Sequence, residues 1–315
     1  MEGTVLALTT APPTSARLPA RAARIRRWRE NLGSYGFITP AFVILGAFVL
    51  FPFLFVIYLS FHHWNLINPN PPWVGFTNYI DLIHSQTFWQ SLLLTLYYIA
   101  GTVPAQIILA LVLALLLSGK IRGLSAFRLG VFSPYVTPVV ATTIVWLWIF
   151  NPEYGLLNYV LHIFHLPALP WLTSPTYAMP GVMIYSVWHD LGFSIIIYLA
   201  GITNLPRDIR EAARIDGAGA WQEFWRVTWP LLTPTTFFLV VINSIGAFKV
   251  FTQIYTLTGG GPVESTTTTG FYLYQYAFTY FKIGYASTVA VALFIFILIL
   301  TLVQLFLAER RVHYQ

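Results

Sequence analysis

The stretch RDIREAARIDGA, from Arg207 to Ala218, lies between two long apolar segments. It concentrates charge in a chain of which only 9% is Asp, Glu, Lys or Arg, whereas 57% is hydrophobic and the mean hydropathy is +0.68. A soluble domain of 315 residues does not bury that much apolar surface, so the composition indicates an integral membrane protein. A loop this rich in charge indicates a docking surface for something outside the membrane.

Six apolar segments flank and surround this stretch, and each is long enough to cross a bilayer as a helix, which takes about 20 residues. They cover about 36–60, 88–117, 130–150, 179–201, 231–255 and 285–308. The first is too long for a signal-peptide core and no small-residue cleavage site follows it, so we expect a retained anchor. The pattern predicts an all-α integral membrane protein with six transmembrane helices.

The distribution of Lys and Arg tests this helix count independently. The loops about 61–87 and 151–178 contain no Lys or Arg, and the last loop on the same side has only Lys282. Basic residues gather in the two termini and in the connections between the second and third spans and between the fourth and fifth spans. The N-terminus holds Arg17, Arg21, Arg24, Arg26, Arg27 and Arg29, and the C-terminus holds Arg310 and Arg311. The first of these connections holds Lys120, Arg122 and Arg128, and the second holds Arg207, Arg210, Arg214 and Arg226. Because basic residues favour the cytoplasmic side, we expect both termini and the charged stretch to be cytoplasmic. The net charge of +6 therefore does not point to nucleic acid.

The charged stretch predicts a short amphipathic helix after Pro206, with Ile209, Ala212 and Ala213 on one face. Gly217-Ala218-Gly219 interrupts it, and a second amphipathic piece, Trp221 to Trp229, returns to the membrane. Two readings remain open from these residues. The loop is either a docking elbow for a partner or a solvated segment whose arginines contact anionic lipid headgroups.

The order of residues in this loop resembles a known signature. Glu211-Ala212-Ala213, three residues, Gly217, nine residues and Val227-Thr228-Trp229-Pro230 resembles the motif of permease subunits of binding-protein-dependent ABC importers. That family has Ile and Leu where this chain has Val227 and Trp229, which are hydrophobic exchanges. Further segments resemble the carbohydrate-type members, the maltose and glycerol-phosphate permeases: Trp73 to Tyr79, Leu199-Ala200-Gly201 with Pro206, Asp216-Gly217-Ala218, and Leu257 to Pro262.

The resemblance implies the architecture of an ABC type I importer permease. It would comprise a cytoplasmic N-terminal arm (1–34), a six-helix permease domain (35–310) with a coupling loop at 204–230, and a C-terminal tail (311–315). In that family the loop sits in a cleft of the ATPase subunit. The residues carried over as coupling residues are Glu211, Ala212, Ala213, Asp216 and Gly217.

The same resemblance implies the partners and the location. The partners would be a second homologous permease, ATP-binding ATPase subunits, an extracytoplasmic substrate-binding protein and the lipid bilayer, with no nucleic acid. The chain would need no cofactor of its own, because ATP and Mg would be bound by the ATPase. It would be a multi-pass protein of a prokaryotic plasma (inner) membrane.

Polar residues within the predicted spans mark a candidate substrate path, because such residues are costly in a membrane. Asp190 lies in the fourth span, and Asn243 and Gln253 lie with Gly246 and Val250 on one predicted stripe of the fifth. Amide groups donate to and accept from sugar hydroxyls. Two aromatic residues of the fourth span are candidates for stacking on a pyranose: Trp188 and Tyr185. The alternative is that the amides only bond neighbouring helices together.

Enzyme chemistry finds little support in the sequence. There is no metal-ligand cluster, no Gly-x-Ser-x-Gly elbow and no catalytic candidate, and Gly259-Gly260-Gly261-Pro262 predicts a tight turn, not a phosphate loop. An ion-driven secondary transporter would need acidic residues in several spans, and Asp190 is essentially the one candidate. We therefore expect a permease for a di- or oligosaccharide. Glycerol phosphate or another polyol-like solute remains the alternative cargo.

Overall fold

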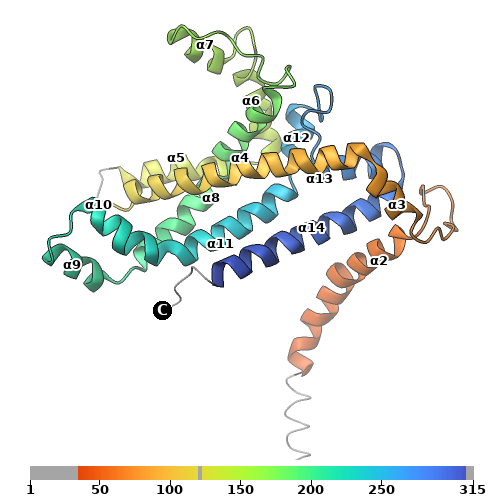
Figure 1. Ribbon diagram of the computed structural model, residues 1–315, viewed down its shortest axis with the longest axis horizontal. Coiled ribbons are helices and arrows are strands. Elements are labelled where there is room, and N and C mark those ends of the chain that lie inside the picture. Colours follow the sequence, from red (N-terminus) through yellow and green to blue (C-terminus); the bar gives the residue numbers. More distant parts are fainter. Residues whose placement is uncertain (1–34, 120–122, 310–315) are drawn as a thin grey trace, which may run out of the picture. The chain divides into compact units, whose positions relative to one another are not determined.

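A computed structural model (Figure 1) describes residues 35–119 and 123–309 of this chain. Within these ranges the ordered elements are helices, and the one β-bridge joins His62 to Trp73. The predicted all-α fold class is therefore confirmed. The predicted N-terminal arm and C-terminal tail lie outside the described residues.

The chain divides into two compact units, Met1–Phe55 and Val56–Gln315. The described part of the first unit is helical from residue 35 and includes one π-helical turn, η1 (Gly46–Leu50), before α2 (Phe51–Ser60). The second unit holds the other elements, and these position the candidate site.

Five helices of the described chain are long and apolar enough to cross a membrane. They are Tyr35–Ser60, α4 (Gln86–Leu117), α8 (Ala178–Thr203), Ala220–Phe248 and α14 (Ile283–Glu309), of which Ile283–Leu307 meets the criterion. The first, second, fourth and sixth predicted spans match within a few residues. Shorter helices connect them: α3 (Thr77–His84), α7 (Leu156–Ile163), α9 (Arg207–Ile215), α12 (Thr252–Leu257) and α13 (Thr269–Tyr274), followed by the π-helical turn η3 (Gln275–Thr279).

The third predicted span, 130–150, is not one helix. It consists of α5 (Leu124–Val136) and α6 (Val139–Ile149), which meet at 102°. Proline disfavours helical geometry in the residue before it, and Thr137 is accordingly extended, with φ −77° and ψ 137°. Pro138 itself has ψ 130° and only begins the next helix. The described residues hold six candidate membrane crossings if this bent pair counts as one.

The fifth predicted span, 231–255, is displaced along the chain. One continuous helix runs from Ala220 to Phe248 through α10 (Ala220–Glu223), the π-helical turn η2 (Phe224–Thr228) and α11 (Trp229–Phe248). The predicted separate piece, Trp221 to Trp229, is thus the beginning of this helix. At its other end, the N–H groups of Lys249 and Val250 close tight turns onto Gly246 and Ala247.

Helix α8 lies at the centre of the second unit, alongside α4, with α5 and α11 also packed against it (Figure 1). The cluster between α4, α8 and α11 includes Ala110, Ile195, Tyr198 and Leu239, each at most 2% exposed. At Gly192, an added Cβ atom would lie 2.8 Å from the carbonyl oxygen of Val131. The backbones of α5 and α8 therefore approach as closely as only glycine allows.

The predicted turn at Gly259-Gly260-Gly261-Pro262 is confirmed. Gly259 and Gly260 have φ of 58° and 86°, a left-handed conformation that glycine adopts without strain. The N–H of Gly261 donates to the carbonyl of Thr258 at 3.0 Å.

Candidate functional site

A cavity of about 230 Å³ with polar and apolar side chains in its wall lies between α4, α5, α8, α11 and α12. Most of its wall comes from side chains inside the membrane-crossing helices. Its lining residues are Tyr98, Thr102, Gln106, Tyr135, Asp190, Phe193, Ile242, Asn243, Gly246, Ala247, Val250 and Gln253. Polar side chains that converge on one space beside apolar ones are typical of a small-molecule site.

Three of the five predicted path residues, Asp190, Asn243 and Gln253, line this one cavity. The predicted single helical stripe, however, is wrong. Helix α11 ends at Phe248, so Val250 and Gln253 do not share a helix with Asn243. The turn at Lys249 and Val250 redirects the chain, and α12 brings Gln253 back to the same space. Their roles in transport stay predictions.

The two predicted stacking residues do not line the cavity. Tyr185 is fully buried, and its hydroxyl pairs with Thr142 Oγ1 at 2.7 Å and donates to the Val139 carbonyl at 3.2 Å. Trp188 is 38% exposed and packs on Trp146, with ring centroids 5.2 Å apart. In this conformation the buried ring of Tyr185 offers no free face to a sugar. Its hydroxyl instead bonds α8 to α6.

One wall of the cavity was missed by sequence reasoning. Tyr98, Thr102 and Gln106 of α4 line it, and none is more than 5% exposed. They stand four residues apart, so they follow one face of the helix. This spacing of polar side chains in an apolar span was the available signal.

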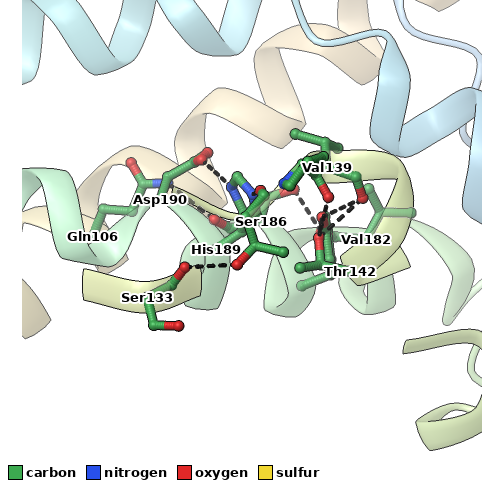
Figure 2. Close-up of polar contacts among 11 residues, drawn as sticks. Gln106, Ser133, Val139, Thr142, Val182, Ser186, His189 and Asp190 are labelled. Carbon is green, nitrogen blue, oxygen red and sulfur yellow. Dashed lines mark hydrogen bonds and ion pairs between the residues drawn. The ribbon is translucent and has the colours of Figure 1, made fainter. Parts of the chain in front are cut away.

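A network of polar contacts ties the cavity to the surrounding helices, and Figure 2 shows its centre. Asp190 Oδ1 lies 2.7 Å from His189 Nδ1, and Gln106 Nε2 donates to the Ser186 carbonyl at 3.5 Å. Asn243 Nδ2 donates to Ser194 Oγ at 3.1 Å. Asn243 therefore bonds α11 to α8 and also lines the cavity, while its role in a substrate path stays a prediction.

The charged loop forms a second candidate site, here called the docking arm (residues 207–219). Helix α9 begins directly after Pro206 and ends before Gly217, whose φ is +84°. The N–H of Ala218 donates to the Ala213 carbonyl at 3.0 Å, which is the longer bond of a Schellman motif. The predicted interruption of the helix is thus confirmed as a glycine-capped end.

The arm presents its predicted coupling residues outward. Glu211, Ala212, Asp216 and Gly217 are exposed, and Ala213 is half-buried. The two alanines leave the backbone of α9 open to close approach, and the carboxylates beside them carry charge. The contacts of these residues with a partner stay predictions.

Membrane-crossing helices around a polar cavity, with an exposed helical arm at a loop, define a membrane transport protein. The family described as the binding-protein-dependent transport system inner membrane component matches residues 76–313. The chain belongs to this family, which confirms the resemblance drawn from the loop motif.

Relatives of similar length cover most of the chain. It is 34% identical over 292 residues to the probable ABC transporter permease protein YesP of Bacillus subtilis, covering 91% of this chain and 94% of the relative. It is 32% identical over 258 residues to the trehalose/maltose transport system permease protein MalF of Thermococcus litoralis, covering 82% and 86%. Both relatives are named as permeases and not as enzymes.

Solved structures show the same fold. A bacterial ABC transporter involved in the import of the acidic polysaccharide alginate matches with a TM-score of 0.76 and 24% identity, covering 90% of this chain and 99% of that chain. A second structure, of a bacterial alginate ABC transporter in complex with an alginate pentasaccharide-bound periplasmic protein, matches with a TM-score of 0.75 and 22% identity, covering 90% and 96%. At these identities the similarity shows the fold alone, which is that of an ABC importer permease.

Proposed function

We propose that this permease carries a neutral di- or oligosaccharide through the cavity between α4, α5, α8, α11 and α12. The observation that carries the proposal is the cavity wall, where a carboxylate, three amides, a hydroxyl and tyrosines face one space inside the membrane-crossing helices. These groups donate to and accept from hydroxyls in several directions, which suits a polyol. The trehalose/maltose relative supports the same class of cargo.

Glycerol phosphate is the second candidate, because the chain is 30% identical to the sn-glycerol-3-phosphate transport system permease protein UgpA of Agrobacterium fabrum. The cavity argues against it. No Lys or Arg of the described chain lines this cavity, whereas the Asp190 carboxylate does. The wall therefore offers a phosphate no permanent positive charge to pair with, so a neutral solute fits better.

The docking arm would couple transport to ATP hydrolysis in a partner. Glu211, Ala212, Ala213, Asp216 and Gly217 would seat the arm in an ATPase subunit, which binds ATP and Mg; this chain itself would catalyse nothing. Closure of two ATPase subunits would draw two such arms together and rock the attached helices, giving alternating access. A second permease would complete the path, and a binding protein would deliver the sugar.

We further propose that the protein lies in a prokaryotic plasma membrane with both termini and the arm in the cytoplasm. The Lys and Arg distribution supports that orientation. The family's description as an inner membrane component supports the location.

The test is uptake by vesicles that contain the importer purified through a tag on this chain. Radiolabelled maltose, trehalose, maltotriose and glycerol 3-phosphate are supplied outside with the binding protein, and ATP inside. We expect accumulation of at least one saccharide that requires ATP. Uptake of glycerol 3-phosphate alone would overturn the sugar proposal. Uptake that follows an ion gradient without ATP would identify a secondary transporter.

Coupling is tested with a matched pair of acidic residues. Glu211→Ala in the arm should lower ATP-driven uptake about tenfold or more, a loss of the size that one charged hydrogen bond produces. Glu153→Ala, at another exposed acidic residue, in the loop before α7, should not. Equal effects of the two substitutions would contradict a specific role for the arm.

A further inference from the structure

His189 is buried beside the cavity without lining it. It is 4% exposed, yet both of its ring nitrogens have oxygen partners. Nδ1 lies 2.7 Å from Asp190 Oδ1 (Figure 2), and Nε2 lies 3.3 Å from the Thr137 carbonyl oxygen. A carbonyl only accepts, so Nε2 carries a proton and donates to Thr137. One imidazole therefore joins a cavity carboxylate to the backbone of another helix.

The Thr137 contact falls at the break between α5 and α6. A helix that ends inside a membrane leaves carbonyl groups without intrahelical donors, and an unsatisfied carbonyl there costs several kcal/mol. Thr137 is the C-terminal cap of α5, and the proline that follows it has no N–H to offer. The His189 N–H supplies a donor to the carbonyl at this 102° bend.

The Asp190 contact is unusual for a helix. Neighbouring side chains in a helix point about 100° apart and do not normally face each other. A separation of 2.7 Å between the side chains of His189 and Asp190 therefore selects one orientation for both. In that orientation the Asp190 side chain is 37% exposed and lines the cavity.

The pair also suits its surroundings electrostatically. An imidazolium with a carboxylate, or a neutral imidazole with a carboxylic acid, carries no net charge. Either arrangement avoids an isolated charge among membrane-crossing helices, which is costly.

We propose that His189 is a positioning residue, which fixes the direction of the Asp190 side chain in the cavity and links that direction to the bend between α5 and α6. The kinetic part of this inference rests on the proposed function, because it takes Asp190 to contact the solute. The structural part, the link to the bend, does not depend on any solute.

The kinetic test is a double-mutant cycle in the vesicle assay, using whichever of maltose, trehalose and maltotriose the wild-type importer takes up fastest. His189→Ala should raise KM about tenfold, and His189→Gln, which keeps an N–H donor, should raise it less. If His189 acts through Asp190, then His189→Ala added to Asp190→Asn should change KM little further. KM effects that simply multiply would overturn the positioning role.

The structural test uses spin labels, for which the chain is suited because it has no native cysteine. Phe127→Cys on α5 and Val145→Cys on α6 are labelled at positions 60% and 59% exposed, and the distance between the labels is measured in the assembled importer. His189→Ala should broaden or shift the distance distribution, whereas Asp190→Asn, which keeps the Thr137 contact, should not. An unchanged distribution in His189→Ala would overturn the link to the bend.

The matched control is Tyr198→Phe. It removes another buried contact of α8, the hydroxyl that donates to Thr236 Oγ1 at 3.0 Å, away from the cavity and the bend. It should alter neither KM nor the label distance, and an effect equal to that of His189→Ala would reduce His189 to a general packing role. If no saccharide is taken up or Asp190→Asn leaves uptake unchanged, the proposed path fails, and the label distances alone decide whether His189 braces the bend.

Discussion

Helices α8 and α14 are nearly equal in length, with 26 and 27 residues, but they occupy opposite environments. The most apolar part of α14 has a mean hydropathy of 2.9 and is 6% buried within this chain; that of α8 has a mean hydropathy of 1.5 and is 50% buried. In a soluble protein the more apolar helix would be the inner one. Here the less apolar helix is central, because lipid covers an apolar surface without cost and cannot satisfy polar groups.

Two polar side chains of α14 also face other helices of the chain instead of lipid. Thr288 Oγ1 donates to the Ser60 carbonyl at 3.1 Å, and Gln304 Nε2 donates to Ser244 Oγ at 3.1 Å. Both therefore turn toward the other helices of the chain, while leucines, isoleucines, phenylalanines and a valine make up the large exposed side chains of α14. In this protein the position of polar residues, more than hydropathy, tells which helix face is inside.

The largest contrast is expected from removing the same side chain in the two helices. Ile195 of α8 is 2% exposed and Ile299 of α14 is 52% exposed. Ile195→Ala should lower the free energy of unfolding by about 2–5 kcal/mol, because it leaves a cavity in a packed core. Ile299→Ala should change it by no more than about 0.5 kcal/mol. Thermal unfolding of the purified protein in detergent measures the loss in each variant. Equal losses would contradict the expected difference between α8 and α14.

The next effect concerns the closeness of α5 to α8. Gly192→Val should cost about 1–3 kcal/mol, because its side chain must displace the backbone at Val131 and Phe132. Gly130→Val on α5 is the control, since nothing lies within 4 Å of the Cβ atom added there. If the two variants unfold at the same temperature, the close approach seen at Gly192 is not a constraint on folding.

A functional effect of smaller size is expected at the inner face of α8. Asp190→Asn keeps the size of the side chain but loses the ion-pairing carboxylate, so we expect uptake to fall about tenfold, or about 1.4 kcal/mol, with assembly intact. Uptake and co-purification with the ATPase are measured in parallel. The exposed acidic residue Glu264 provides the control Glu264→Gln, which should transport normally. Unchanged uptake in Asp190→Asn would remove this residue from the path.

The smallest effect is expected from cysteine labelling, which compares the exposure of α14 with that of a buried helix position without unfolding the protein. Leu302 of α14 is 55% exposed and Leu239 of α11 is fully buried. After Leu302→Cys or Leu239→Cys in this cysteine-free chain, a lipid-soluble maleimide should react several-fold faster at position 302. Similar rates in the assembled importer would mean that a partner subunit covers this part of α14.

The sequence predicted the helices well where hydropathy and geometry agree. The spans at 88–117, 179–201 and 285–308 needed only length and apolarity. The end of the fifth span was misjudged, and the sharp bend in the third is marked only by its prolines, because a hydropathy window sums residues without regard to direction. It cannot register the turn at Thr137-Pro138 or the helix end at Phe248.

The candidate site was predicted in part for a similar reason. Asp190 and Asn243 stood out as polar residues in apolar spans, and that signal is independent of exact helix ends. Tyr185 and Trp188 were chosen because aromatic rings stack on sugars, but rings also fill cores, and only packing distinguishes the two uses. Tyr98, Thr102 and Gln106 required the periodicity of α4 to be read for polar residues as well as for apolar ones.

One consequence follows from the unbroken helix between Ala220 and Phe248. Its first residue adjoins the docking arm, and Asn243 on the same helix forms part of the cavity wall. At about 1.5 Å per residue, a single rod of about 35 Å connects these two points. A tilt of the helix at the arm would therefore displace the Asn243 amide in the cavity wall as part of the same body, reduced only where η2 and Pro234 let the helix flex. Movement that one continuous helix transmits in this way needs no relay of side-chain contacts across the membrane.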